Sequence, residues 1–360
     1  MPEKIIIAVD AMSGSGGPLV IAQGLSNFSK KHGDVFLRIF GKKDLLSEEL
    51  RRAELSVDSF TIVDCQDVVL DNDKPMHTWR NNKFSSMRKA IEDVRDKKAS
   101  AVISCGNTGA LMMTAKMLLK TLPHVKRPGI LAVIPGISSR GTIMLDVGAN
   151  IECGVEHLFH FAIMGCCFAQ IVLATNDPKI GILNIGSEEI KGRILEQKSY
   201  SILKESGLNF TGFVEANEVV KGKVDVLVTD GFSGNIFLKA SEGAAEMCIN
   251  VFKNTVKNAG FFSKLAAILL KSCLKKSLSV ISPNRHNGAM FVGLNGIVIK
   301  SHGSANAEGV ENALSVAYKL SRANINQKIE CKLHEMKEKG ITLNFVDKLK
   351  HKSAQILGMK

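Results

Sequence analysis

The chain has 360 residues, 45% of them hydrophobic, and its 47 Lys and Arg against 35 Asp and Glu give a net charge of +12. This length allows one large core or two lobes, and the basic balance favours an acidic protein or an anionic lipid surface as a partner. We expect no nucleic acid partner, because one Trp and two Tyr offer few rings for base stacking and no reading motif is present.

The sequence also indicates the compartment. No apolar stretch reaches the roughly 20 residues that a membrane-spanning helix needs. A strand begins almost at once at Lys4, so we expect no signal peptide and a cytosolic location. The eight cysteines show no CxxC spacing and no histidine at a zinc-like distance, which predicts buried free thiols and no metal. Only Cys105, in a Gly-rich motif, is considered as a nucleophile, and no nearby base is evident.

Short apolar runs alternate with longer amphipathic ones along the chain. The runs that predict strands cover residues 4–12, 35–40, 60–64, 101–104, 130–134, 142–146, 179–185, 210–215, 224–229 and 296–300. The helices expected between and after them cover residues 19–32, 43–53, 85–97, 111–119, 155–170, 193–204, 236–247 and 307–321, with a Lys-rich helix and tail from 327. This alternation predicts βαβ units around a parallel sheet.

Residues 71–83 are polar and predict a loop instead of a regular element. This loop carries three cations, Lys74, Arg80 and Lys83, that can reach into a cleft. The alternative is that they belong to a solvated loop surface.

Several of the expected strands end in loops of small and polar residues. Three of these loops open a helix: residues 13–18, 105–110 and 230–235. A Gly-rich turn that opens a helix offers free N–H groups and the positive helix end to an anion. Because ligands bind outside the carboxyl ends of strands in an α/β sheet, we expect these loops to converge on one phosphate-binding cleft. The alternative for residues 230–235 is an ordinary turn with Asn235 near the helix cap.

Residues 258–282 break the pattern with an amphipathic helical segment. Its apolar face carries Phe261, Phe262, Leu265 and Leu269, and several lysines lie along one edge of the other side. Such a helix can lie in a membrane interface. It can equally be a dimer contact or a core helix with its lysines in water.

Taken together, six motifs resemble the phosphate acyltransferase family PlsX. They occur in family order over roughly residues 4 to 320, as residues 7–12 with the Gly-Pro loop that follows, SCGNTGAL (104–111), LDVGANIEC (145–153), GILNIGSEEIKG (181–192), DGFSGN (230–235) and GLNGIVIKSHGS (293–304). The resemblance implies an enzyme that transfers an acyl group from acyl-carrier protein to inorganic phosphate without a cofactor. Its acyl phosphate product feeds a membrane glycerol-3-phosphate acyltransferase in phospholipid synthesis.

The same resemblance implies a three-layer α/β fold with a parallel or mixed sheet, like phosphotransacetylase and the isocitrate and isopropylmalate dehydrogenases. It also implies a homodimer, peripherally attached to the inner face of the cell membrane, and it favours membrane contact by Phe261, Phe262, Leu265 and Leu269. The catalytic domain is expected over residues 1–326, with the amphipathic segment inside it and a basic helix and tail over 327–360.

The expected chemistry needs no activated serine or cysteine, because phosphate dianion is already a nucleophile at neutral pH. The site must overcome the repulsion between that dianion and the developing oxyanion, and one well-placed donor contributes about 3–4 kcal/mol. We expect phosphate on Gly106, Thr108, Gly109, Gly231, Ser233 and Gly234, with Arg80 and Lys83 as cations. The expected catalytic residues are Asn107, Asn235, Lys191 and His302, and the expected orienting residues are Asp146, Asn150 and Asp230. His302 is expected to protonate the leaving thiolate or, alternatively, to be a satisfied strand-end histidine.

One motif departs from the family, whose members usually carry Gly-Gly-Asp where this chain has Ser13-Gly14-Ser15. Two other functions stay open. One is a phosphotransacetylase that uses coenzyme A and a short acyl group, since fold analogy does not separate the two. The other is a non-enzymatic basic scaffold that bridges lipid and carrier protein. A metal-dependent NAD dehydrogenase is disfavoured, because the chain has no clustered Asp ligands and no GxGxxG motif.

Overall fold

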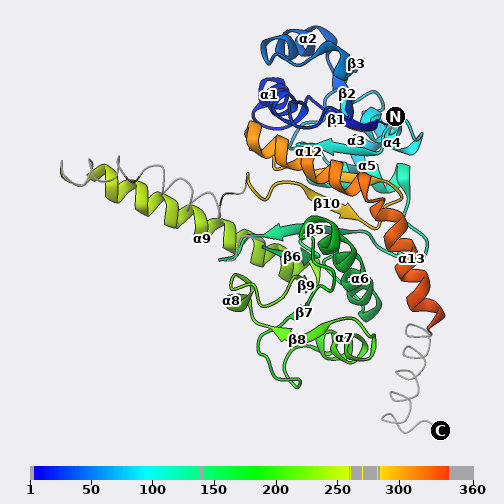
Figure 1. The fold of residues 1–360 in the computed structure, drawn as a ribbon, viewed down its shortest axis with the longest axis vertical. Coiled ribbons are helices and arrows are strands. Elements are labelled where there is room, and N and C mark those ends of the chain that lie inside the picture. The colour runs from blue at the N-terminus through cyan, green and yellow to red at the C-terminus, as the bar shows by residue number, and fades with distance from the viewer. Residues whose placement is uncertain are drawn as a thin grey trace.

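The computed structural model describes residues 4–137, 141–258, 260, 270, 282 and 284–339 (Figure 1). In this part of the chain eleven strands form one sheet, in the order β3-β2-β1-β4-β11-β10-β5-β6-β9-β7-β8. The strands are β1 (Ile5–Asp10), β2 (Val35–Gly41), β3 (Phe60–Asp64), β4 (Ala101–Ser104), β5 (Gly129–Ile134), β6 (Thr142–Leu145), β7 (Ile180–Leu183), β8 (Phe210–Val214), β9 (Val226–Val228), β10 (Ala289–Val292) and β11 (Ile297–Lys300).

Helices cover both faces of this sheet, so that the fold has three layers. The helices are α1 (Gly17–Ser29), α2 (Lys43–Arg52), α3 (Pro75–Asn81), α4 (Ser86–Arg95), α5 (Thr108–Leu119), α6 (Val155–Val172), α7 (Ile194–Glu205), α8 (Ala216–Val219), α9 (Gly231–Asn258), α12 (Ala307–Arg322) and α13 (Ile325–Glu338). Successive strand residues point to opposite faces. On β4, Ile103 belongs to the core under α1 and α12, whereas Val102 belongs to the core under α4 and α5.

The sheet is mixed. Strands β1, β2, β3, β4 and β11 form one parallel half, and β6, β9, β7 and β8 form the other. Strands β10 and β5 join the halves through antiparallel pairs. The sequence reading missed β10, because β11 follows it with no helix between them, so that it does not fit the expected βαβ alternation.

One other expectation is corrected by the structure. Residues 71–83 are not wholly a loop, because they contain α3, which begins at Pro75. Proline fits the first helical turn, but the polar composition concealed this helix. The Lys-rich helix expected from residue 327 is α13, which begins at Ile325 and buries Ile325 and Ile329 in the main core. The domain boundary between residues 326 and 327 stays a prediction. The membrane-contact residues Phe261, Phe262, Leu265 and Leu269 lie outside the described residues.

Helix α6 is long and apolar enough, by length and composition, to cross a membrane. However, 67% of it is buried inside the fold, where it packs against α7, α13 and β9. It is the central helix of the core on this face of the sheet.

We predict that His160 on α6 makes the protein sensitive to acid. Burial lowers the pKa of His160 from 6.5 to about 4. Between these values the unfolded chain binds the proton and the folded protein does not. The free energy of unfolding therefore decreases as the pH falls from 6.5 towards 4, by about 3 kcal/mol in total. Urea titrations at pH 7 and pH 4.5 are expected to show a smaller decrease for His160→Gln. The exposed His334→Gln is the control and should follow the wild type; an unchanged decrease in His160→Gln would contradict the prediction.

Candidate functional site

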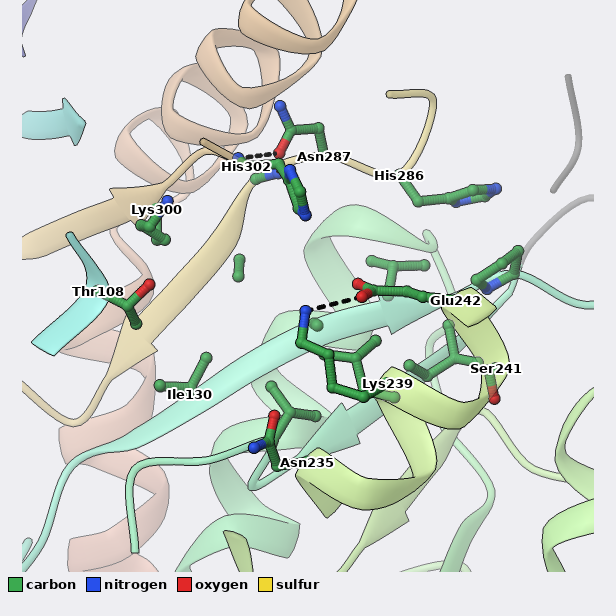
Figure 2. Close-up of a pocket in the computed structure, with 18 of the residues that line it drawn as sticks. Thr108, Ile130, Asn235, Lys239, Ser241, Glu242, His286, Asn287, Lys300 and His302 are labelled. Atoms are coloured by element: carbon green, nitrogen blue, oxygen red, sulfur yellow. Dashed lines mark hydrogen bonds and ion pairs between the residues drawn. The ribbon is translucent and has the colours of Figure 1, made fainter. Parts of the chain in front are cut away.

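A cavity of about 300 Å³ lies between β5, the first half of α9 and the loops that follow β4 and β11 (Figure 2). Its polar side chains come from four separate parts of the chain, and they are Thr108, Asn235, Lys239, Ser241, Glu242, Ser282, His286, Asn287, Lys300 and His302. Its apolar lining is mostly from β5 and α9, and it consists of Ile130, Ala132, Val133, Ile134, Pro135, Val147, Leu238, Ala245 and Ala289. Of the Gly-rich loops expected to converge, those after β4 and β9 reach the cavity through Thr108 and Asn235, as does the loop after β11 through His302, whereas residues 13–18 do not line it. Phosphate binding by these loops stays a prediction.

The first turn of α9 is fixed by glycines and by Asp230. The Asp230 carboxylate accepts a hydrogen bond from the Ser233 amide at 2.8 Å and so caps the helix. Gly231 donates its amide to the Asn150 carbonyl at 2.8 Å. A Cβ atom on Gly234 would lie 1.9 Å from the Asp146 carbonyl oxygen, so only glycine fits there. The helix begins at Gly231, and Asn235 lies in its second turn instead of near the cap.

Asp146 organises the loop that supports this turn. Its fully buried carboxylate accepts hydrogen bonds from the amides of Ile130, Gly148, Ala149 and Asn150 at 2.8–3.1 Å. Burial raises the pKa of Asp146, and these hydrogen bonds oppose that rise. The Asn150 side chain also donates to Asp146, at 2.9 Å. Asp146 and Asn150 thus hold this loop against α9. Their predicted role of orienting the catalytic groups stays a prediction.

Asn107 caps α5. Its Oδ1 accepts from the Ala110 amide at 2.9 Å, and its Nδ2 donates to the carbonyl of Asp71 at 2.6 Å and that of Asp73 at 3.2 Å. In this conformation the donors of Asn107 are already used, to hold the segment before α3. Among the described residues, the amides of Thr108 and Gly109 have no protein acceptor, as expected for the first turn of a helix. The predicted roles of these residues stay predictions.

Two cations of the cavity, Lys239 and Lys300, were not predicted. Lys239 follows the helical spacing from Asn235, and Lys300 lies at the end of a predicted strand. Lys239 lies one helical turn after Asn235, on the same face of α9, and forms an ion pair of 2.7 Å with Glu242 (Figure 2). Lys300 is the last residue of β11, two positions before His302. Its Nζ donates to the carbonyls of Cys105, at 3.3 Å, and of Ser301, and within the described residues it has no carboxylate partner. Burial lowers the pKa of Lys300, and the nearby Lys239 lowers it further.

His302 points into the cavity from the loop after β11 (Figure 2). Its amide donates to Asn287 Oδ1 at 2.9 Å, and its Nδ1 accepts from the Ser304 amide at 3.2 Å. The neutral ring therefore carries its proton on Nε2. The pKa of His302 is lowered by burial and by Lys300 and Lys239, and Glu242 opposes this effect.

The cations predicted from the sequence lie elsewhere. Arg80, Lys83 and Lys191 are exposed, and none of them lines the cavity. The loop of Lys191 is nevertheless tied to α9, because Arg193 forms an ion pair with the buried Asp230. Nothing in this geometry tests what these three cations do, and their roles stay predictions.

The motif that departs from the family is held by hydrogen bonds. Ser13 donates to the buried Asp10 at 2.6 Å, alongside Ser86 and Ser104 at 2.6 and 2.7 Å. The Ser15 amide donates to the carbonyl of the cavity residue Gly303 at 2.8 Å. The serines therefore fasten the loop after β1 to its neighbours.

Cysteine and metal chemistry receive no support here. Cys105 is buried, and burial raises the pKa of its thiol, which disfavours the reactive thiolate. The seven cysteines within the described part of the chain are free. In that same part, no group of three or more His, Cys, Asp or Glu side chains is arranged to hold a metal ion.

Known proteins are similar to this chain in sequence and, separately, in fold. Residues 5–328 match the model of a family described as fatty acid synthesis protein. The chain is 42% identical over 340 residues to a phosphate acyltransferase of Anaplasma phagocytophilum (strain HZ), across 93% of this chain and 98% of that one. It is 43% identical over 338 residues to a phosphate acyltransferase of Ehrlichia ruminantium (strain Gardel), across 92% and 97%.

Solved structures agree on the fold. A phosphotransacetylase from Streptococcus pyogenes matches 89% of this chain and 95% of its own, with a TM-score of 0.60 and 16% identity. A branched-chain phosphotransacylase from Enterococcus faecalis V583 matches 88% and 99%, with a TM-score of 0.52 and 16% identity. These low identities show the fold alone, and they confirm the predicted phosphotransacetylase-like architecture.

Proposed function

This chain belongs to the phosphate acyltransferase family of fatty acid synthesis proteins, and we propose that it moves a fatty acyl group from acyl-carrier protein to inorganic phosphate in the cavity between β5 and α9. It is an acyltransferase of lipid synthesis. The observation that carries the proposal is the character of this cavity, which combines lysines and amide donors with an apolar lining. Lysines and amide donors suit an anion, and an apolar lining suits a fatty chain.

Phosphate is assigned to the end of the cavity near Thr108 and Lys300. Lys300 offers an ammonium group without a carboxylate partner in the described chain, and Thr108 stands at the N-terminus of α5, whose helix end favours an anion. Asn235 adds a side-chain amide from α9. Positive charge and N–H donors lower the repulsion between phosphate dianion and the oxyanion that develops on the thioester carbonyl.

His302 is assigned to the leaving group. Its Nε2 proton faces the cavity, and its lowered pKa keeps the ring neutral at pH 7. The neutral Nε2–H donates a hydrogen bond to the thiolate that departs as the C–S bond breaks, and the proton of the attacking hydrogen phosphate passes to that thiolate. The acyl group then leaves as acyl phosphate, and the carrier leaves as a free thiol.

Acyl-carrier protein is preferred to coenzyme A as the donor, because a net charge of +12 steers an acidic protein towards the site. The solved structures of similar fold are phosphotransacetylases, so acyl-CoA is the alternative donor. The test is to incubate the purified protein with labelled phosphate and palmitoyl-carrier protein, palmitoyl-CoA or acetyl-CoA, and to measure acyl phosphate. We expect the highest kcat/KM with the carrier protein. A preference for acetyl-CoA would reject this substrate, and no acyl phosphate from any donor would favour the scaffold function.

We further propose that the protein is a homodimer attached to the inner face of the cell membrane, where its product reaches a membrane glycerol-3-phosphate acyltransferase. In support, α9 extends away from the sheet and exposes Met247 and Val251 on the way to residues 258–282 (Figure 1). Flotation with anionic liposomes tests the membrane contact. Phe262→Glu and Leu269→Glu are expected to leave the protein in the soluble fraction, and continued flotation would refute lipid contact by this segment.

A further inference from the structure

The apolar residues of the cavity lie mainly along two walls, and the space between these walls is called the lane. One wall is β5, where Ile130, Ala132 and Ile134 occupy alternate positions and therefore point to the same face as α9. The other wall is α9, whose Leu238 and Ala245 fall on the face that carries Asn235 and Lys239. Helix α9 and strand β5 contact each other directly.

This lane leads away from the assigned phosphate position. In Figure 2, Thr108 and Ile130 lie at one end of the cavity, and Ser241 and Glu242 lie at the other. Ile130 and Ile134 are about 13 Å apart along an extended strand. Asn235 and Ala245 are about 15 Å apart along a helix. The two walls therefore have similar lengths, and each begins beside the polar end.

Two small side chains lie on the walls of this lane, one on β5 and one on α9. Ala132 lies midway along the β5 wall, and Ala245 is the last residue of α9 that lines the cavity. Both are partly buried, so neither side chain is simply a surface residue. A larger side chain at either position would fill the space between the walls.

We propose that this lane is the acyl-chain channel of the enzyme, and that Ala132 and Ala245 set the longest acyl chain it accepts. The inference rests on the proposed function, because it needs the thioester carbonyl at the Lys300 end. A saturated chain has no polar group to satisfy, and the β5 wall offers it an apolar surface along its whole length, whereas on α9 Leu238 and Ala245 flank the Lys239–Glu242 ion pair. Ala245 lies at the end farther from Lys300, so it contacts only long chains.

The test is the chain-length profile of Ala245→Phe with butyryl-, octanoyl- and palmitoyl-carrier protein. We expect kcat/KM for palmitoyl to fall at least about tenfold while that for butyryl stays within about twofold. Ala132→Val is a milder change in the other wall and should alter the profile in the same direction. Ala244→Phe is the matched control, because Ala244 is the adjacent exposed residue, and its profile should equal that of the wild type. An equal fall for all chain lengths in Ala245→Phe, or an unchanged profile, overturns the proposal.

A binding measurement separates this inference from the proposed function. A dansyl-labelled fatty acid is titrated into each protein, and its affinity is expected to fall in Ala245→Phe but not in Ala244→Phe. If the wild type forms no acyl phosphate from any donor and this selective loss is seen, the proposed function fails, and with it the role of the lane in catalysis, while fatty-acid binding in the lane is supported. If the wild type is active and both variants bind the probe like the wild type, the channel fails alone.

Discussion

Gly234→Ala is expected to lower the free energy of unfolding by about 3 kcal/mol or more and to abolish acyl transfer. An added Cβ atom would lie 1.9 Å from the carbonyl oxygen of Asp146 and 3.0 Å from its carbonyl carbon. The atoms in the way are backbone, and the Asp146 side chain anchors that backbone through the amides of Ile130 and Asn150. A shift of either backbone costs free energy, so α9 must move away from the Asp146 loop. The cavity residues of α9 move with it.

Helix α9 offers a matched control for this prediction. Gly243 lies on the same helix, is exposed, and has nothing within 4 Å of an added Cβ atom. Gly243→Ala should therefore be neutral or raise the stability by up to about 1 kcal/mol, because alanine has the higher helix propensity. Urea unfolding of the two variants and the wild type measures the difference. Gly234→Ala with wild-type stability would refute the close-approach explanation for this glycine.

The fold was predictable because most of its elements carry their own local pattern. The β-branched run before Asp64 predicted the strand over residues 60–64, and the structure has the same bounds. The elements that escaped were weak in that pattern. Strand β10 is followed by β11 with no helix between them, and its pairing with β5 and β11 makes it a strand although its sequence does not require one. Its position between two antiparallel neighbours depends on the whole sheet, and no short stretch of sequence contains that information.

The site was predictable only in part, for a related reason. Gly-rich loops identified Thr108, Asn235 and His302, because a strand end marks where such residues gather. The same reasoning chose cations from polar loops and missed Lys239 and Lys300, which lie on a helix and at the end of a strand. Helical spacing could have placed Lys239 beside Asn235. The position of Lys300 depends on the pairing of β11 with β4, which brings it next to Cys105.

Lys300→Gln is expected to lower kcat/KM for phosphate by about 100-fold or more, the effect of losing one charged donor at a developing oxyanion. Glutamine removes the charge, yet its amide can still donate to the carbonyls of Cys105 and Ser301 that now hold the ammonium group. Folding should therefore be preserved, and an unchanged melting temperature would confirm this. Lys300→Arg keeps the charge and is expected to recover part of the lost rate.

Lys191→Gln makes the comparison decisive, because Lys191 was predicted as the catalytic cation from its motif and lies exposed outside the cavity. Steady-state kinetics with phosphate as the varied substrate gives kcat and KM for each variant. If phosphate binds beside Lys300, the loss of kcat/KM in Lys300→Gln exceeds that in Lys191→Gln, and saturating phosphate does not restore the wild-type rate. A wild-type rate in Lys300→Gln together with a large loss in Lys191→Gln would move the phosphate from the β4 and β11 loops to the loop between β7 and α7, which Arg193 ties to Asp230.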